Sequence, residues 1–327
     1  MEKNLNIRIG HLKIVDHLVL GYSVLRLQND CHESHELGNS TLENIPMNSW
    51  EQISDGLKQG KLHGAFITSP LAMDLFASGL DISFLMFVHR SGSLIVKNKK
   101  NPLKNISELK GKTLLIPHEL SVQHMLLHKL LAAANIGLQF SNAEDSNIAN
   151  SLARSESTSP VLMPEMLEND EDRDIGGFMV AEPYGSQAIA RGIGERLCTS
   201  DSLWKDHPCC GLVVQKGFAA SHGNLLEKLV RHFFQSAKQL NHLILDDQTD
   251  ENGLDWAENF LDQDKDIVKQ SLFNSNVSFN PKKLAPDKEK LDIIQTYMTG
   301  TMGVMPRKID LDSFLTPGYA IKAISEI

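Results

Sequence analysis

Short apolar runs that alternate with helix-forming segments are the feature that most constrains the fold of this chain. Each clear run is followed within a few residues by a segment with helical periodicity. Strands are expected at residues 7–10, 64–68, 82–88, 113–116, 176–180 and 212–214. Repeated β-α units with short links predict an α/β fold, in which a mostly parallel sheet is covered by helices.

The helices expected beside these strands have recognisable starting residues. Ser69-Pro70 is typical of a helix start, with serine as the N-cap and proline at the first helical position. Ser121 is a second candidate N-cap, and the segment 50–61 is amphipathic. Further helices are expected at 19–27, 71–77, 121–134, 148–153 and 186–190, and through most of the chain after Gly217.

The length and charge of the chain limit its partners. At 327 residues, the chain is expected to form roughly two domains of ~150 residues each. A net charge of −9 repels phosphate backbones and anionic lipid, so nucleic acid and membrane surfaces are not expected partners. No stretch approaches the ~18 consecutive apolar residues of a membrane helix, so direct membrane insertion is not expected.

The first residues bear on where the protein works. Residues 1–6 lead directly into the apolar-alternating 7–9, and neither a secretory apolar region nor a lipid-attachment cysteine precedes them. The chain as written is therefore expected in the cytoplasm. If a leader has been removed, the periplasm or the cell surface is expected instead.

Four cysteines are too few for a disulfide framework in a chain of this length. Cys209 and Cys210 are adjacent and could pair only in a strained ring. A zinc site near His207, or around Cys31 and its two flanking histidines, is an alternative, but C-x-x-C spacing is missing. Buried, reduced thiols are the favoured interpretation, and no metal site is predicted.

Four turns that follow predicted strands form the candidate ligand site. In open α/β sheets, ligands bind beyond the carboxyl ends of the strands, where helix N-termini present unpaired N–H groups. The turns lie at 10–17, 68–70, 117–121 and 182–185. A helix N-terminus carries about half a unit of positive charge, so we expect an anionic group such as carboxylate, nitrate, sulfonate or phosphate.

The histidines divide into two groups. His124 and His128 share one helix face, and a packed or surface pair is favoured over a metal pair because no further ligand is assigned to them. Other histidines lie at or just beyond strand ends, where a ligand would lie, although each taken singly is more often structural. These are His11, His17, His89 and His118.

Enzyme signatures are missing from the sequence. It contains no G-x-S-x-G, no G-x-x-x-x-G-K-[ST] and no G-x-G-x-x-G. We therefore predict a binding protein with no catalytic residue and no cofactor.

An ordered set of segments resembles one family. The segments are IRIGHL at 7–12, LKQGKLHGAF at 57–66, ISELKGKT at 106–113, MPEML at 163–167 and GFMVAEPY at 177–184. In this order they resemble the nitrate/taurine/alkanesulfonate (NMT1/THI5-like) class of ABC-transporter solute-binding proteins, which also holds thiamine-pyrimidine-precursor binders. The resemblance covers most of residues 7–242, whereas the remainder matches only as C-terminal helices.

The resemblance implies a type II periplasmic-binding-protein fold, with two lobes joined by a hinge and the ligand cleft between them. Lobe one would comprise 1–88 plus 212–327 and lobe two 89–211, with the hinge near 88–91 and 211–214. The ligand-binding side chains would be His11, Lys13, Asp16, His17, Thr68, Ser69, His89, Arg90, His118, Ser121, Gln123, Glu182 and Tyr184.

Two acidic residues qualify the expected ligand chemistry. Asp16 and Glu182 would repel an anion unless they are paired, for example with Lys13 or Arg90. Their presence could equally indicate a ligand with an amine or a ring N–H.

The resemblance implies ABC-type uptake of a small, anionic ligand by a monomer that closes on it and works with an ABC permease. Three alternatives stay open. A leaderless relative could be a cytoplasmic ligand sensor that passes its open or closed state to a regulatory protein. A thiamine-pyrimidine-synthase-like enzyme is the second, since the cysteine-rich run of those enzymes falls where Cys209-Cys210 stand here. A scaffold that has lost its ligand is the third.

Overall fold

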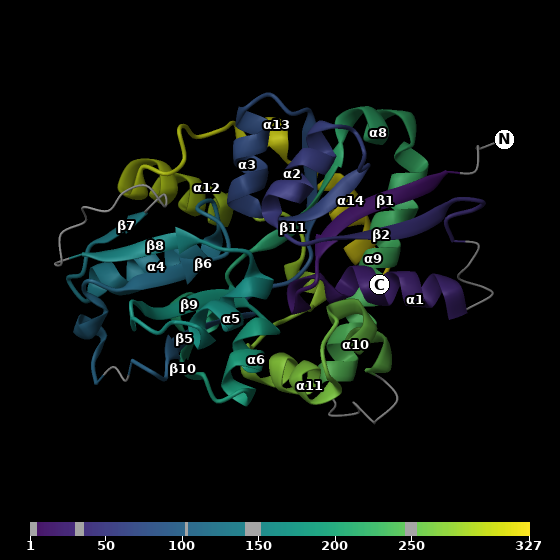
Figure 1. Ribbon diagram of the computed structural model, residues 1–327. Coiled ribbons are helices and arrows are strands. Elements are labelled where there is room, and N and C mark those ends of the chain that lie inside the picture. Colours follow the sequence, from purple (N-terminus) through teal and green to yellow (C-terminus); the bar gives the residue numbers. More distant parts are fainter. Residues whose placement is uncertain (1–4, 30–35, 102–103, 141–151, 246–253) are drawn as a thin grey trace.

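The protein consists of two α/β lobes, each built on its own mixed sheet (Figure 1). The computed structural model describes residues 5–29, 36–101, 104–140, 152–245 and 254–327. One sheet has five strands in the order β2-β1-β3-β11-β4, and the other has six in the order β10-β5-β9-β6-β8-β7. The two-lobed α/β fold expected from the sequence is therefore confirmed.

The five-stranded sheet forms the first lobe, on the right of Figure 1. β1 runs parallel to β2 and β3, whereas β11 lies antiparallel between β3 and β4. All side chains of β3 and β4 are buried, because both faces of the sheet are covered. The strands are β1 (Asn6–Leu12), β2 (Thr41–Met47), β3 (Gly64–Thr68), β4 (Ile82–Phe87) and β11 (Cys210–Gln215).

The six-stranded sheet forms the second lobe. β6 runs parallel to β8 and β9, and β7 parallel to β8, whereas β5 is antiparallel to β9 and β10. The strands are β5 (Ser93–Asn98), β6 (Thr113–Ile116), β7 (Leu138–Phe140), β8 (Ala153–Ser157), β9 (Ile175–Ala181) and β10 (Gly194–Thr199).

Helices cover both sheets. In the first half of the chain they are η1 (Val15–His17), α1 (Leu18–Asn29), α2 (Trp50–Lys58), α3 (Ser69–Ala77), η3 (Ile106–Leu109), α4 (Val122–Ala133), η4 (Pro160–Leu162) and α5 (Met163–Glu168). The others are α6 (Tyr184–Ala190), α7 (Ser200–Leu203), α8 (Lys216–Ser221), α9 (Gly223–Leu245), α10 (Asp255–Leu261), α11 (Lys265–Asn274), η5 (Pro281–Lys283), α12 (Lys288–Tyr297), η6 (Met298–Met302), α13 (Leu311–Phe314) and α14 (Gly318–Ser325). None of the helices that the structure describes is long and apolar enough to cross a membrane.

Three chain segments meet where the lobes join. The chain leaves the first sheet after β4, returns to it before β11, and passes the same place again after α11. Arg90 pairs through its backbone with Ser278, with N–O distances of 2.8 and 3.0 Å, and Ser91 N–H donates to the His207 carbonyl at 3.1 Å. These hydrogen bonds hold the segments side by side.

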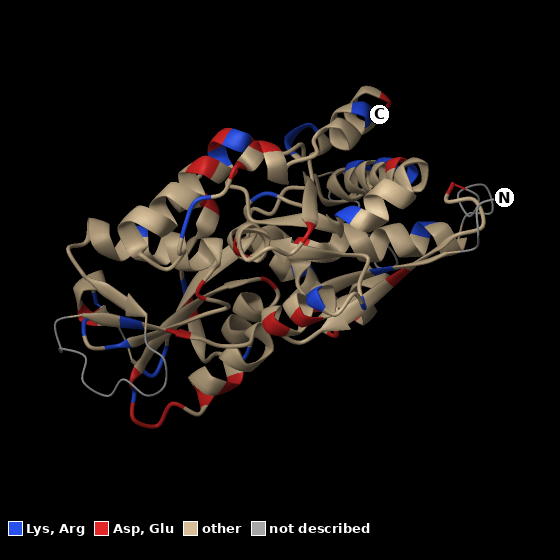
Figure 2. Cartoon of the chain, turned by 90° about the horizontal axis from the view of Figure 1, so that it is seen from above, with Lys and Arg blue, Asp and Glu red and all other residues tan. Residues whose placement is uncertain are grey.

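The C-terminal helices contact both lobes. α10 packs against α1 of the first lobe, α11 against α6 of the second, and α12 against both α3 and α4. Lys and Arg and Asp and Glu residues are scattered over the helices and loops of both lobes (Figure 2).

Several predicted elements differ from the observed ones. β11 and β5 are antiparallel, so the sheets are less parallel than expected, because these strands belong to the segments that pass between the lobes. β2 and β10 were not predicted, since these edge strands are largely polar and exposed. β5, β7 and β8 were also missed. Of the helix expected at 148–153, residues 148–151 lie outside the described residues, and Ala153 begins β8.

The two predicted helix caps have different outcomes. Ser121 is the N-cap of α4, and its hydroxyl accepts from His124 N–H at 3.1 Å. The cap prediction for Ser69 is wrong: α3 begins at Ser69 itself, after Thr68, and the Ser69 hydroxyl donates to the Cys209 carbonyl instead. Ser69 thus ties the start of α3 to the residue before β11.

Gly211 shows how tightly the first sheet is packed at β11. A Cβ at this position would collide with the Phe84 ring and crowd the Met86 carbonyl. We expect Gly211→Ala to lower the free energy of unfolding by about 1–3 kcal/mol, as overpacking does. Chemical denaturation would measure the change.

A matched substitution tests the physical reason. Gly217 lies in the first turn of α8, and a methyl group added there would meet no atom within 4 Å apart from its chain neighbours and the backbone of its own helix. Gly217→Ala should therefore be neutral or stabilising by up to about 1 kcal/mol. Equal destabilisation by both substitutions would contradict the packing explanation.

Candidate functional site between the lobes

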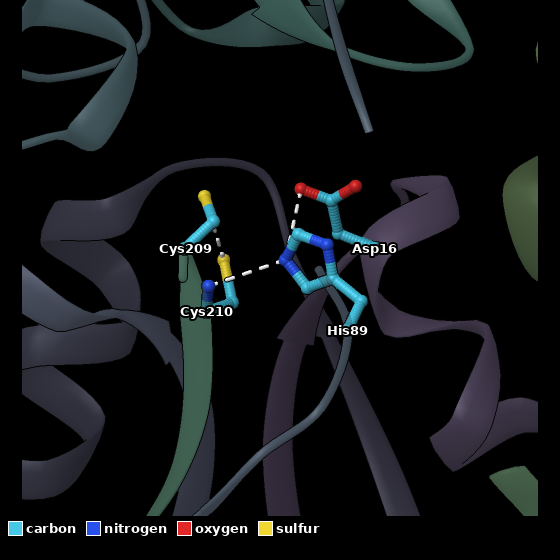
Figure 3. Close-up of side chains that lie close together, drawn as sticks. All are labelled: Asp16, His89, Cys209 and Cys210. Atoms are coloured by element: carbon cyan, nitrogen blue, oxygen red, sulfur yellow. Dashed lines mark hydrogen bonds and ion pairs between the residues drawn. The ribbon is translucent and has the colours of Figure 1, made fainter. Parts of the chain in front are cut away.

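Four side chains with metal-ligating and acid–base chemistry meet at one edge of the first sheet (Figure 3). Asp16 lies in η1 after β1, and His89 follows β4. Cys209 precedes β11, and Cys210 is its first residue. Because β11 is antiparallel to β3 and β4, its amino end lies beside their carboxyl ends. The topology therefore brings residues from three distant parts of the sequence together.

The cluster of Asp16, His89, Cys209 and Cys210 is compact and buried. One ligand-type atom from each residue lies within 4.8 Å of all the others. His89 Nε2 lies 3.2 Å from Asp16 Oδ2, and the two sulfur atoms are 3.9 Å apart. The four residues are at most 1% exposed.

The hydrogen bond to His89 defines which ring nitrogen carries a lone pair. Cys210 N–H donates to His89 Nε2 at 3.2 Å, so this nitrogen is an acceptor. The Asp16 oxygen that faces it is also an acceptor when the carboxyl is ionised. Two lone-pair atoms 3.2 Å apart require a proton or a cation between them.

Burial sets the charge of the cluster. It raises the pKa of Asp16 well above its ordinary value, and the neighbouring Cys209 and Glu182 act in the same direction. The hydrogen bond with Cys210 holds the pKa of Cys209 well below its ordinary value, with His89 contributing. Burial raises the pKa of Cys210. Cys209 is thus the more acidic thiol of the pair.

The second lobe covers the cluster with three residues. Gln123 of α4 donates through Nε2 to Cys209 Sγ at 3.5 Å and to Ser93 Oγ at 3.0 Å. Gly92 has a φ of +105°, and a Cβ there would collide with the Asp16 carboxylate. Only glycine therefore lets this segment approach Asp16 so closely.

Glu182 is the third of these residues. Its backbone carbonyl accepts from Val15 N–H at 2.7 Å, which joins the two lobes. Its carboxylate accepts from the Ser186 N–H at 2.8 Å and the Ser186 hydroxyl at 2.5 Å. Burial raises the pKa of Glu182 to about 7, against the opposing effect of these hydrogen bonds.

Buried polar atoms without a hydrogen-bond partner gather in this region. More than half of such side-chain atoms in the described part of the chain belong to the cluster or to residues beside it in the cleft. They are Asp16 Oδ1 and Oδ2, His17 Nε2, Thr68 Oγ1, His89 Nδ1, Gln123 Oε1 and His207 Nε2. Each such atom costs about 1–3 kcal/mol. They come from both lobes, and they offer a small ligand both donors and acceptors.

The expected ligand residues of the first lobe lie beside the cluster. His11 donates through Nδ1 to the Leu12 carbonyl at 2.9 Å and stacks on Phe260, and burial lowers its pKa to about 4. His17 Nδ1 accepts from Leu12 N–H at 3.0 Å. Thr68 and Ser69 are fully buried.

Lys13 and Arg90 do not neutralise the acidic residues. Lys13 pairs with Asp262 at 2.9 Å. Arg90 packs on the Phe87 ring and donates through Nε to the Lys283 carbonyl at 2.7 Å. Lys13 and Arg90, the two cations named as possible partners of Asp16 and Glu182, are thus engaged elsewhere, and His89 Nε2 lies 3.2 Å from Asp16 Oδ2.

Tyr184 and His118 mark the rim of the interface between the lobes. Tyr184 donates its hydroxyl to the Lys13 carbonyl at 3.1 Å, beside a cavity of about 130 Å³ that both lobes line. His118 Nε2 lies 3.7 Å from Glu51 of the first lobe. The predicted ligand residues thus divide into a buried group around the cluster and a group at the rim.

Three residues of this region were not among the predicted ligand-binding residues. Cys209 and Cys210 were predicted to be buried, reduced thiols, and this is confirmed. Their place opposite Asp16 and His89 was not foreseen, nor was the burial of His207 beside them. The signal was the adjacent cysteines at the start of an apolar strand. Cys31 and its flanking histidines lie outside the described residues.

His124 and His128 form packed contacts, as predicted. His124 Nδ1 donates to the Glu119 carbonyl at 2.8 Å, and its Nε2 accepts from the Ser155 hydroxyl at 3.0 Å. His128 Nδ1 lies 2.9 Å from the Tyr297 hydroxyl. These contacts use the ring nitrogens that a metal would need.

The fold and the cleft define a two-lobed α/β protein of the kind with a site between its lobes. Comparison with known proteins identifies its family. The model of the NMT1-like family matches residues 2–251, and the chain belongs to this family. The resemblance noted in the sequence is therefore confirmed.

Solved structures share the fold. The ligand-binding component of an ABC-type import system from Staphylococcus aureus, with zinc bound, matches with a TM-score of 0.79 and 23% identity, over 98% of this chain and 99% of that one. The periplasmic nitrate-binding protein NrtA from Synechocystis matches with a TM-score of 0.78 and 14% identity, over 99% of this chain and 89% of that one. The alkanesulfonate-binding protein SsuA from Xanthomonas axonopodis, bound to MOPS, matches with a TM-score of 0.72 and 14% identity, over 97% of this chain and 99% of that one.

Two curated relatives come from Synechocystis sp. The nitrate import ATP-binding protein NrtC is 28% identical over 225 residues, which are 64% of this chain and 31% of that protein. The bicarbonate transport ATP-binding protein CmpC is 24% identical over 253 residues, 72% of this chain and 35% of that protein. The chain spans about a third of the length of these relatives.

The burial of His124 predicts a pH dependence of stability. Burial lowers its pKa from 6.5 to about 4, so the folded state keeps the ring neutral while the unfolded chain accepts a proton. The stabilising contribution is complete above pH 6.5 and is lost as the pH falls through 4. The free energy of unfolding should therefore fall by about 3 kcal/mol across this range on account of His124.

The variant His124→Gln should remove this part of the acid sensitivity. Urea denaturation at pH 7 and at pH 4 would measure it, with His222→Gln, whose ring stacks on Phe218 at 5.1 Å, as the control for loss of one imidazole. Identical acid sensitivity in His124→Gln and the unaltered protein would contradict the assignment.

Proposed function

We propose that this protein is the solute-binding component of an ABC-type import system and that it closes its two lobes on a small solute. The observation that carries the proposal is the set of buried polar atoms without partners, supplied by both lobes around Asp16 and His89. The family and the fold support it. So do the names of the relatives and neighbours, which describe import and ligand-binding proteins.

Closure of the lobes is the proposed mechanism. Besides packing, the lobes share the Val15–Glu182 backbone hydrogen bond, the Tyr184–Lys13 hydrogen bond and one from the Ser159 hydroxyl to the Asn48 carbonyl at 2.6 Å. A solute that binds the closed state more tightly adds its contacts to these. About 5.5 kcal/mol of differential binding moves a two-state equilibrium from 1:99 to 99:1.

The buried acidic residues constrain the chemistry of the solute. An anion, which the helix N-termini led us to expect, would lie beside Asp16, Glu182 and Cys209. Burial raises the pKa of both Asp16 and Glu182, and protonation of these carboxyls would reduce their repulsion of an anion. A cation would be stabilised by the same residues in their ionised form.

The partner of the protein is also part of the proposal. A solute-binding component works with a permease, and the names of the two Synechocystis relatives, both ATP-binding proteins of transport systems, support such an assembly. The sensor alternative uses the same closure and differs only in the partner. The enzyme alternative rests on the buried cysteines, and turnover that depends on Cys209 would favour it.

A screen of solutes tests the proposal. Thermal unfolding would be followed with nitrate, bicarbonate, alkanesulfonates, amines, thiamine pyrimidines and divalent metal ions. A solute at a hundred times its Kd stabilises the folded state by about 2.7 kcal/mol. Small-angle X-ray scattering with each hit should show a smaller radius of gyration. A hit without compaction would contradict closure.

Tyr184 provides a sharper prediction about closure. Tyr184→Phe removes the hydroxyl that donates to the Lys13 carbonyl. This hydrogen bond joins the two lobes, so in the proposed mechanism it forms only when they close. We expect solute affinity to fall about 2- to 10-fold, which corresponds to about 0.5–1.5 kcal/mol for one hydrogen bond. Isothermal titration calorimetry would measure the affinity.

Tyr319→Phe on α14 is the matched control, because Tyr319 lies outside the interface between the lobes. It should leave the affinity unchanged. An unaltered affinity in Tyr184→Phe as well would show that this hydrogen bond does not contribute to closure.

A further inference from the structure

Two distances within the cluster match those of a tetrahedral metal site, and all four ligand-type atoms lie within 4.8 Å of one another. Two thiolates about 2.3 Å from a shared tetrahedral Zn²⁺ stand about 3.8 Å apart, and a nitrogen and an oxygen ligand stand about 3.4 Å apart. In this protein the sulfur atoms of Cys209 and Cys210 are 3.9 Å apart, and His89 Nε2 and Asp16 Oδ2 are 3.2 Å apart. Two opposite edges of the six in a tetrahedron are thus already close to the required length.

We propose that Asp16, His89, Cys209 and Cys210 bind a thiophilic divalent metal ion of the Zn²⁺ class and that this ion is the solute of the cleft. The proposal rests on the solute-binding function and names its solute class. The cluster supplies two sulfurs, one imidazole nitrogen and one carboxylate oxygen. Such a set suits borderline-soft metals, whereas Mg²⁺ and Ca²⁺ require oxygen ligands and higher coordination numbers.

A cation also resolves the contact between the two acceptor atoms. Asp16 Oδ2 and His89 Nε2 face each other at 3.2 Å, and neither oxygen of Asp16 has a hydrogen-bond partner in the described residues. A metal ion between them accepts both lone pairs. In exchange, His89 Nε2 gives up its hydrogen bond from Cys210 N–H.

Proton balance follows from the ligands. A metal ion binds thiolates, a carboxylate and a neutral imidazole, so each ligand that is protonated releases its proton to solvent as the metal bond forms. With all three acids ionised, the ligands carry three negative charges against the two positive charges of the ion. No oxidation or reduction occurs.

The second lobe supplies the surroundings of this site. The Gln123 amide donates to Cys209 Sγ, as outer-shell groups do for metal thiolates. Gly92 places the start of the second lobe directly on the Asp16 carboxylate. All four ligands belong to the first lobe and the connecting segments. A bound ion would therefore be held by one lobe and covered by the other, which couples its binding to closure.

The test uses the full chain, freed of metal and kept reduced, with Zn²⁺ as the probe. We expect calorimetry to show one Zn²⁺ bound per chain. Co²⁺ should give the thiolate-to-metal charge-transfer band and the visible bands of a tetrahedral site. Cys209→Ser should weaken Zn²⁺ binding at least about 100-fold, the upper end of what loss of an outer-shell group costs.

Two further variants make the result specific. Asp16→Asn keeps the size of the side chain and should also weaken binding, while the cobalt–thiolate band remains. Cys198→Ser, at a half-buried thiol outside the cluster, should leave the Kd unchanged. Circular dichroism would confirm that each variant is folded. If Cys209→Ser does not fold, protection of Cys209 and Cys210 from alkylation by added Zn²⁺, with Cys198 unaffected, replaces it.

Two results would overturn the proposal: no stoichiometric Zn²⁺ binding by the unaltered chain, or undiminished binding when Cys209 and Cys210 are both serine. The scattering experiment separates this proposal from the proposed function. Zn²⁺ binding without compaction would leave the metal site standing and contradict solute binding by closure. An anion could instead compact the protein to the same extent with or without Zn²⁺, and equally in Cys209→Ser. That result would support solute binding and refute the metal site.

Discussion

The antiparallel return of β11 between β3 and β4 is the constraint on which the rest of the structure depends. The chain leaves the first sheet after β4 to build the second lobe, and β11 brings it back into the middle of that sheet. This return puts the amino end of β11 beside the carboxyl ends of its neighbours. His89, Cys209 and Cys210 thereby reach Asp16, which follows the parallel strand β1.

Burial then determines the chemistry of the cleft. Water is excluded from Asp16, His89 and both cysteines, so each charge there must be neutralised by a proton, by a neighbour or by a ligand. The pKa values of Asp16 and Cys210 rise for this reason. The same exclusion makes every contact to a bound solute stronger than it would be in water. A closed cleft lined by such groups therefore favours a ligand that satisfies them together.

Much of the fold could be predicted from the sequence because its signals are local. The apolar runs at 64–68, 82–88 and 113–116 and the Ser121 cap indicated elements that the structure contains. Edge strands β2 and β10 could not be predicted in this way, since half-exposed strands lack a continuous apolar run. Asp16 and His89 were candidates because they follow predicted strands. Lys13 and Arg90 were possible partners for the acids, but side-chain direction is set by neighbours such as Asp262 and Phe87.

The sequence by itself determined the α/β class, the order of the main elements and the turns that could contact a ligand. These depend on the spacing of apolar residues and on caps, which act over a few residues. Only the tertiary structure decided that Cys209 and Cys210 lie against Asp16 and His89. Strand order and direction make that contact across more than a hundred residues, and no local pattern records which strand will lie beside which.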